Sequence, residues 1–314
     1  MTLRFSNQRL EEDAMQKARF GEVITAMVTP FDRSGSLNVE AARRLARHLV
    51  EHGSDGVVVS GTTGEAPTLS HEEKRALLEA VVDEVGDRAT VIAGTGTYDT
   101  AESILLTKEA AGIGADACLV VTPYYSKPPQ NALLAHFTKV ADSSRVPVVI
   151  YDIPGRTGRR IERSTMVALA RHGRICAVKD AVGEASETAR LRADLDASGS
   201  HDFEIYSGDD VLLLPHLAAG ATGIISVCSH VVGRQMHQVV SGFHDGKVDE
   251  AKRIYLELLP LFDTMMGITG SPIPVKAALN MTGVDVGEPR LPLVAATSEE
   301  QAAIRVALER SGVL

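Results

Sequence analysis

Short runs of β-branched and apolar residues recur along this chain, and a helical pattern follows each of them. Through most of the chain the runs begin about 27 to 34 residues apart. They are Val23–Thr29, Gly56–Ser60, Thr90–Gly94, Ala117–Thr122, Val146–Asp152, Ile175–Lys179, Phe203–Ser207 and Gly223–Val227. Such continuous apolar character is typical of strands that are buried on both faces of a parallel sheet. Eight strand–helix units in about 220 residues predict an α/β fold, the (β/α)8 TIM barrel.

A doubly wound parallel sheet is the competing architecture, but no Gly-x-Gly-x-x-Gly motif follows a predicted strand. Strand patterns stop after about residue 243, and helical patterns continue at Val248–Met266, Pro274–Thr282 and Ser298–Ser311. We therefore expect an N-terminal extension over residues 1–20, a catalytic barrel over 21–242 and a small C-terminal helical domain over 243–314.

The net charge of −9 argues against a nucleic-acid partner, because phosphates are bound by clustered lysine and arginine. No stretch approaches the roughly 18 consecutive apolar residues of a membrane span, so no membrane partner is expected. Cys118, Cys176 and Cys228 lie in separate apolar runs, which favours buried free thiols and a cytoplasmic location. His48 and His52 have the i, i+4 spacing of metal ligands but no accompanying third ligand, so we expect no metal site.

Lys179 ends the apolar run that begins at Ile175 and is followed by Asp180. The carboxyl ends of barrel strands carry the active site in this fold. A low-dielectric wall there lowers the pKa of an ammonium group and frees the amine to attack a carbonyl. The alternative is a surface lysine just beyond a strand, and the neighbouring polar residues decide between the two.

Polar residues gather after several of the other predicted strands, in the motifs Gly61-Thr62-Thr63-Gly64-Glu65, Thr122-Pro123-Tyr124-Tyr125, Tyr151-Asp152-Ile153-Pro154-Gly155-Arg156 and Ser207-Gly208-Asp209-Asp210. Adjacent tyrosines in an extended chain point to opposite sides, so one of the hydroxyls can face the site. One amine, several hydroxyls and an arginine suit Schiff-base chemistry on a 2-oxo acid. The imine withdraws electrons from the neighbouring carbon, which loses a proton and adds to an aldehyde, while the hydroxyls carry protons.

Four motifs resemble, in order and spacing, those of the dihydrodipicolinate synthase family, within the pyruvate-dependent class I aldolases. They are Gly61-Thr62-Thr63-Gly64-Glu65, Thr122-Pro123-Tyr124-Tyr125, Tyr151-Asp152-Ile153-Pro154-Gly155-Arg156-Thr157-Gly158 and Val178-Lys179-Asp180. The resemblance runs from about Gly21 to the C-terminus and includes Pro272-Ile273-Pro274-Val275-Lys276. It implies that pyruvate and L-aspartate 4-semialdehyde condense and cyclise in the diaminopimelate route to lysine, without cofactor or metal. It also implies a homo-oligomer, usually a homotetramer built as a dimer of dimers.

The resemblance assigns catalytic roles to four residues. Lys179 is the Schiff-base lysine, and Tyr151 is the central proton-transfer residue. Thr62 and Tyr125 are its relay partners, and Tyr125 belongs to the site of the neighbouring subunit.

Four further residues are implied to bind substrates. Thr63 holds the carboxylate of pyruvate, and Arg156 holds the carboxylate of the semialdehyde. Gly208 and Ile225 contribute main-chain contacts.

A regulatory pocket for lysine lies at the dimer interface in inhibited members of the family. His71, Glu102 and Tyr124 match that pocket, whereas Lys74 replaces a histidine and Tyr98 replaces an asparagine. A fixed cation and a bulkier ring disfavour a cationic ligand. We therefore expect the pocket to be degenerate and lysine to inhibit weakly or not at all.

Arg156 separates this prediction from its nearest alternative, an aldolase or lyase of 2-keto sugar acids of the N-acetylneuraminate lyase or 2-keto-3-deoxygluconate aldolase type. Those enzymes share the lysine and tyrosine but generally lack this arginine. Asp152 and Gly155 stand where many family members have asparagine and serine, and we expect these differences to tune the reaction. A barrel that only binds or regulates, and a metal- or phosphate-dependent barrel enzyme, are further alternatives.

Overall fold

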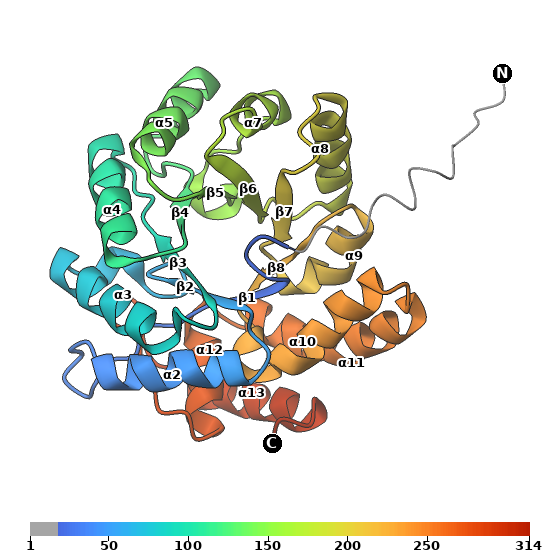
Figure 1. Cartoon of the computed structure of the whole chain (residues 1–314). Coiled ribbons are helices and arrows are strands. Elements are labelled where there is room, and N and C mark those ends of the chain that lie inside the picture. The colour runs from blue at the N-terminus through green and yellow to red at the C-terminus, as the bar shows by residue number, and fades with distance from the viewer. Residues whose placement is uncertain (1–17) are drawn as a thin grey trace.

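The computed structural model describes residues 18–314. The eight strands pair in parallel in the order of the sequence, and β1 pairs with β8 to close the barrel (Figure 1). They are β1 Val23–Ala26, β2 Gly56–Val59, β3 Thr90–Gly94, β4 Ala117–Val121, β5 Val148–Asp152, β6 Ile175–Asp180, β7 Glu204–Ser207 and β8 Gly223–Ser226. The predicted fold class is confirmed.

Helices surround the barrel and extend beyond its last strand (Figure 1). They are α2 Val39–Glu51, α3 His71–Val85, α4 Thr100–Ile113, α5 Gln130–Ser143, α6 Pro154–Thr157, α7 Arg163–Ala170, α8 Ala185–Ala197, α9 Leu213–Ala218, α10 Ser229–His244, α11 Val248–Gly267, α12 Ile273–Met281 and α13 Ser298–Arg310, with short 3-10 helices η1 Ala66–Thr68 and η2 Asp210–Leu212. Within residues 18–314, no helix has the length and apolar character that crossing a bilayer requires.

Local sequence signals fix several element ends. Ser70 caps α3 in a capping box, because its hydroxyl accepts from the Glu73 N–H and the Glu73 carboxylate accepts from the Ser70 N–H.

The first predicted strand runs to Thr29, whereas β1 ends at Ala26. The chain leaves the sheet there because the Val28 N–H donates to His230 and the Thr29 hydroxyl donates to the Gly64 carbonyl.

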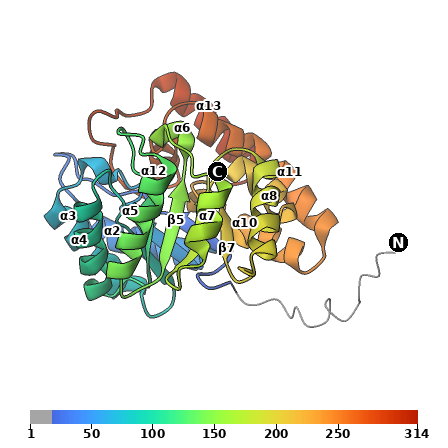
Figure 2. The same cartoon turned by 90° about the horizontal axis from the view of Figure 1, so that it is seen from above.

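The hydrophobic core has a barrel interior and an outer layer. The interior cluster includes Ile24, Val58, Tyr151 and Ile225. In the outer layer, one continuous cluster joins residues of α2 and α3 to residues of α10 through α13. Figure 2 shows the C-terminal segment reaching the end of the barrel that carries α6. The predicted division at residue 242 stays a prediction, and most of the predicted extension over residues 1–20 lies outside the described residues.

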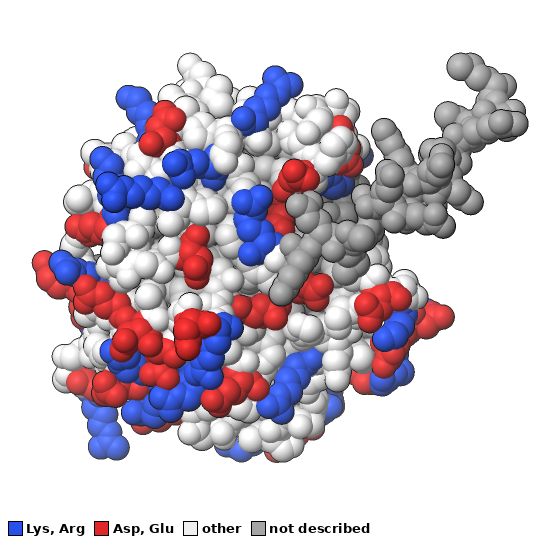
Figure 3. Space-filling view, in the orientation of Figure 1, with Lys and Arg blue, Asp and Glu red and all other residues white. Residues whose placement is uncertain are grey.

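Charged side chains of both signs are interspersed on the face that Figure 3 shows, most densely over α2 and α3. Arg43 pairs with Asp83 at 2.6 Å, and Arg47 pairs with Glu84 at 2.6 Å across these two helices. Basic groups that are paired in this way differ from the clustered basic surface that a nucleic acid binds.

Candidate active site

Lys179 and Tyr151 lie side by side at the carboxyl ends of β6 and β5, where they are register partners. The Lys179 Nζ atom is 4.5 Å from the centroid of the Tyr151 ring. Each residue is only 5% exposed. Successive strand residues alternate between faces, and the following residues, Asp152 and Asp180, accept hydrogen bonds from the Ile161 N–H and the Thr188 hydroxyl instead. The side chains of Lys179 and Tyr151 therefore point into the barrel interior.

Burial lowers the pKa of Lys179 from 10.5 to about 8. The Asp210 carboxylate opposes this decrease in pKa, and the Arg156 guanidinium adds to it. The ammonium loses hydration in the low-dielectric interior, so the neutral amine is favoured. A substantial fraction of a nucleophilic amine is then present at mildly alkaline pH.

Burial also raises the pKa of the Tyr151 phenol, to about 12. Arg156 and a side-chain interaction with Thr62 oppose that increase, because both favour the ionised form. The phenol is therefore protonated at neutral pH and can donate its proton. Thr62 is the neighbouring hydroxyl through which that proton can pass.

A cavity of about 250 Å³ has Tyr151 in its lining, whereas Lys179 is not among the lining residues. Thr62, Tyr151 and Arg156 line it together with Lys74 and Tyr124. Two cations and two phenols around a small cavity suit a small anionic substrate.

Three predicted binding residues, Thr63, Gly208 and Ile225, are not among the residues that line this cavity. Thr63 is 4% exposed, and Ile225 is buried in β8 within the interior cluster that includes Tyr151. Gly208 lies against the reactive lysine, because an added Cβ atom would be 3.1 Å from the Lys179 Cγ and 2.9 Å from the Ala181 Cβ. Glycine is therefore the residue that lets the chain pass this close to Lys179.

Tyr125 is not brought to the other predicted catalytic residues of the same chain. Its side chain is 93% exposed and its φ is 69°. The preceding Tyr124 instead lines the cavity and packs edge-to-face on Tyr98, with 5.4 Å between ring centroids. The two adjacent tyrosines thus face different environments.

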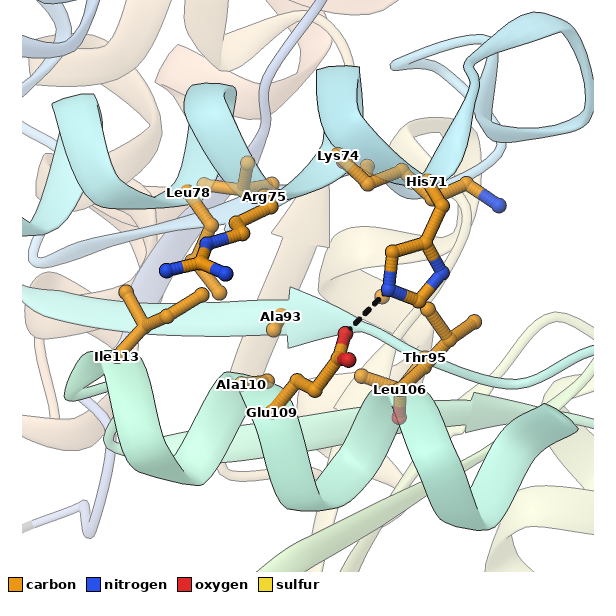
Figure 4. A pocket seen from close by; sticks show the side chains of 13 residues that line it. His71, Lys74, Arg75, Leu78, Ala93, Thr95, Leu106, Glu109, Ala110 and Ile113 are labelled. Atoms are coloured by element: carbon orange, nitrogen blue, oxygen red, sulfur yellow. Dashed lines mark ion pairs between the residues drawn. The ribbon is translucent and has the colours of Figure 1, made fainter.

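The residues predicted for a regulatory pocket lie next to this cavity. Figure 4 shows the crevice between α3 and α4, where the His71 Nε2 is 2.6 Å from the Glu109 carboxylate. Lys74 lines both this crevice and the larger cavity, and its side chain runs past His71 and away from Glu109 (Figure 4). Glu102, in the first turn of α4, is close enough to Tyr124 to help raise the pKa of its phenol, which burial raises most.

Asp210 was not singled out in the sequence, although it influences the amine of Lys179. Its buried carboxylate accepts from the Ser226 hydroxyl and from the Val227 and Cys228 N–H groups, the last two at 3.1 Å each. An acidic pair directly after a predicted strand is a signal for such a group. The same pattern indicates a helix cap, which is the role that Asp209 takes toward Val211.

Possible metal ligands are few in the described part of the chain. Over residues 18–314, no three His, Cys, Asp or Glu side chains are grouped as a metal site requires. His48 and His52 stack on each other with ring centroids 4.0 Å apart. That the enzyme needs no metal stays a prediction.

Comparison with known proteins identifies the family. The sequence profile of the Dihydrodipicolinate synthetase family matches residues 19–311. The 4-hydroxy-tetrahydrodipicolinate synthase of Mycolicibacterium paratuberculosis is 52% identical over 301 residues, which cover 95% of this chain and 97% of that protein. A crystal structure of dihydrodipicolinate synthase from Bacillus anthracis is 41% identical with a TM-score of 0.89, covering 94% of this chain and 99% of that one.

A structure of the enzyme from Cyanidioschyzon merolae with lysine bound is also 41% identical, with a TM-score of 0.90, and covers 94% of this chain and 99% of that one. The family profile and these relatives each span nearly the whole chain, and the barrel matches those of the solved structures. This chain is therefore a lyase that belongs to the dihydrodipicolinate synthetase family.

Proposed function

We propose that this enzyme condenses pyruvate with L-aspartate 4-semialdehyde in the diaminopimelate route to lysine, which is the 4-hydroxy-tetrahydrodipicolinate synthase reaction. The observation that carries the proposal is the buried amine of Lys179, whose pKa is lowered to about 8, beside the protonated phenol of Tyr151. Membership of the family supports the choice of substrates.

The first half of the reaction forms an imine. The neutral Nζ of Lys179 attacks the C2 carbonyl of pyruvate, and the resulting carbinolamine loses the former carbonyl oxygen as water. Tyr151 donates a proton to that leaving oxygen, and Thr62 returns a proton to the phenolate. Thr63 holds the pyruvate carboxylate in this proposal, with main-chain contacts from Gly208 and Ile225.

The second half forms a carbon–carbon bond. Loss of a proton from the pyruvate methyl group gives an enamine, whose carbon adds to the aldehyde carbon while the aldehyde oxygen takes up a proton. Arg156 binds the semialdehyde carboxylate as a planar two-pronged donor. The amino group of the semialdehyde then attacks the imine carbon, which closes the ring and releases the Lys179 amine.

Tyr125 supports a proposed homo-oligomer of at least two subunits, and the family resemblance extends the proposal to a homotetramer. An aromatic ring that is 93% exposed contributes nothing to the site of its own chain. We assign it to the site of a neighbouring subunit, where its hydroxyl completes the proton relay. The described cysteines are buried and free, which suits a reducing compartment, and we propose the cytoplasm.

Reductive trapping tests the chemistry. Borohydride in the presence of pyruvate should attach a stable adduct to the peptide that contains Lys179, as read by mass spectrometry. Lys276 is an internal control, because it is also buried but pairs with Glu65 at 2.7 Å and should stay unlabelled. A Lys179→Arg variant should lose the adduct. A native enzyme without label on Lys179 would contradict the proposed function.

The trapping rate should depend on pH through the amine. The rate should rise with pH with a midpoint near 8, well below the ordinary lysine pKa of 10.5. Arg156→Ala removes a like charge, so the midpoint should move upward, and Asp210→Asn removes an opposite charge, so it should move downward. A native midpoint near the ordinary value would show that burial does not free this amine.

Arg156→Ala should separate the two substrates. The variant should lose about tenfold or more in kcat/KM for the semialdehyde, because charge-assisted hydrogen bonds to its carboxylate are lost. Formation of the pyruvate imine at saturating pyruvate and at a pH above the midpoint should change little. Equal losses in both steps, or good turnover of uncharged sugar aldehydes by the native enzyme, would favour the 2-keto sugar acid aldolases.

Lysine should inhibit weakly, because Lys74 contributes a fixed cation to the place where His71, Tyr98, Glu102 and Tyr124 gather. Initial rates measured with lysine up to about 1 mM should stay close to the uninhibited rate. Lys74→His combined with Tyr98→Asn removes both obstacles and should increase sensitivity. Collapse of the native rate at sub-millimolar lysine would contradict this prediction.

A further inference from the structure

Glu65 ends the loop that carries Thr62 and Thr63, and its backbone is left-handed, with φ 56° and ψ 34°. Residues with a Cβ atom adopt this conformation rarely, and glycine is the usual choice. The side chain is also buried, with the residue only 3% exposed. A glutamate in a place that suits glycine, with its carboxylate removed from water, indicates that the carboxylate itself is needed.

The partners of that carboxylate come from the C-terminal part of the chain. The Lys276 Nζ, on α12, is 2.7 Å from one oxygen of Glu65, and the Arg290 N–H donates to the other at 2.8 Å. Lys276 is fully buried. Two sequence motifs to which the proposed reaction gives no role, the glutamate after the threonines and the lysine of Pro272–Lys276, thus meet in one ion pair.

The surroundings of Lys276 and Arg290 fix this contact in place. The face of the Phe31 ring lies 4.2 Å from the Lys276 Nζ and 4.1 Å from the Arg290 Cζ. The Arg290 guanidinium also donates to the Thr68 carbonyl at 2.9 Å and to the Glu73 carboxylate at 2.8 Å. The C-terminal segment therefore holds the chain both at Glu65 and just beyond it.

Short backbone contacts connect Glu65 to the threonines. The Glu65 N–H donates to the Thr62 carbonyl at 3.1 Å, and the Ala66 N–H donates to the Gly61 carbonyl at 3.2 Å. The Gly64 carbonyl accepts from the Thr29 hydroxyl at 2.6 Å. Because these hydrogen bonds join neighbouring residues of one tight loop, a displacement of Glu65 should also displace Thr62 and Thr63.

We infer that Lys276 is a positioning residue: through Glu65, it holds Thr62 and Thr63 in the geometry that binds pyruvate and relays its protons. The inference rests on the proposed function of the two threonines. A buried ion pair is a poor source of stability compared with apolar residues of the same size, whereas it can specify one arrangement of the chain. The C-terminal helices act on the reaction through this contact.

Lys276→Met tests the inference, because it keeps the length of the side chain and removes the charge. The KM for pyruvate should rise about tenfold, since a displaced catalytic group has effects of this size or larger. The KM for the semialdehyde should stay within about twofold, because Arg156 lies on a different loop. A purely structural role for Lys276 would not separate the two substrates in this way.

Leu279→Ala is the matched control. Leu279 lies three positions further along the same helix, is fully buried and belongs to the outer apolar cluster. Its truncation should lower the melting temperature and leave both KM values within about twofold, at a temperature where every variant is folded. A second variant, Glu65→Gln with Lys276→Met, leaves no unpaired buried charge and decides the outcome if the single variant does not fold.

A selective rise in the pyruvate KM in Lys276→Met, or in the double variant, supports the inference. An unchanged pyruvate KM, or parallel changes in both KM values, overturns it. A failure of the proposed function can be told apart from these results, because it would appear as a native enzyme that forms no pyruvate adduct on Lys179.

Discussion

The reaction that we propose depends on one ammonium group, that of Lys179, which the barrel buries without placing a carboxylate in direct contact with it. Among residues 18–314, Lys179 forms no ion pair, and its Nζ lies over the ring of Tyr151. Lys276 shows the contrast, because it is at least as buried but lies 2.7 Å from a carboxylate. Burial alone does not make a lysine reactive. Burial lowers the pKa of both amines, but at Lys276 the adjacent Glu65 carboxylate opposes that decrease and forms an ion pair with the ammonium group, whereas Lys179 has no such partner.

The fold and the proximity of Lys179 to Tyr151 could be predicted because their signals are local. Apolar runs at regular spacing define strands wherever the strands are buried on both faces. Lys179 ends one such run and Tyr151 is the last residue but one of another, and parallel strands bring their carboxyl ends to the same face. The cap at Ser70 is likewise encoded within four residues.

The parts that could not be predicted depend on partners far along the chain. The end of β1 is set by His230, 202 positions from Val28, and no pattern near Thr29 contains that information. Asp210 influences Lys179 from η2, beyond the end of β7, and Lys74 reaches the cavity from α3. The roles of Glu65 and Lys276 emerge only when the last helices are packed on the barrel. The spacing of residues along the sequence indicates which side chains are neighbours on one helix or strand, but not which helices and strands pack against each other.

The contact between the C-terminal segment and the threonine loop has a consequence for how this chain folds during translation. The hydrogen bond between Arg290 and Glu65 joins residues 225 positions apart. On the ribosome, the loop with the two threonines therefore emerges long before Arg290, its partner, has been synthesised. Domains fold as their segments become available, so a nascent barrel can assemble before this loop has its partners. A translation product interrupted before Arg290 would then carry Lys179 without the contacts that hold this loop, so the proposed site depends on a segment that is synthesised long after the two threonines.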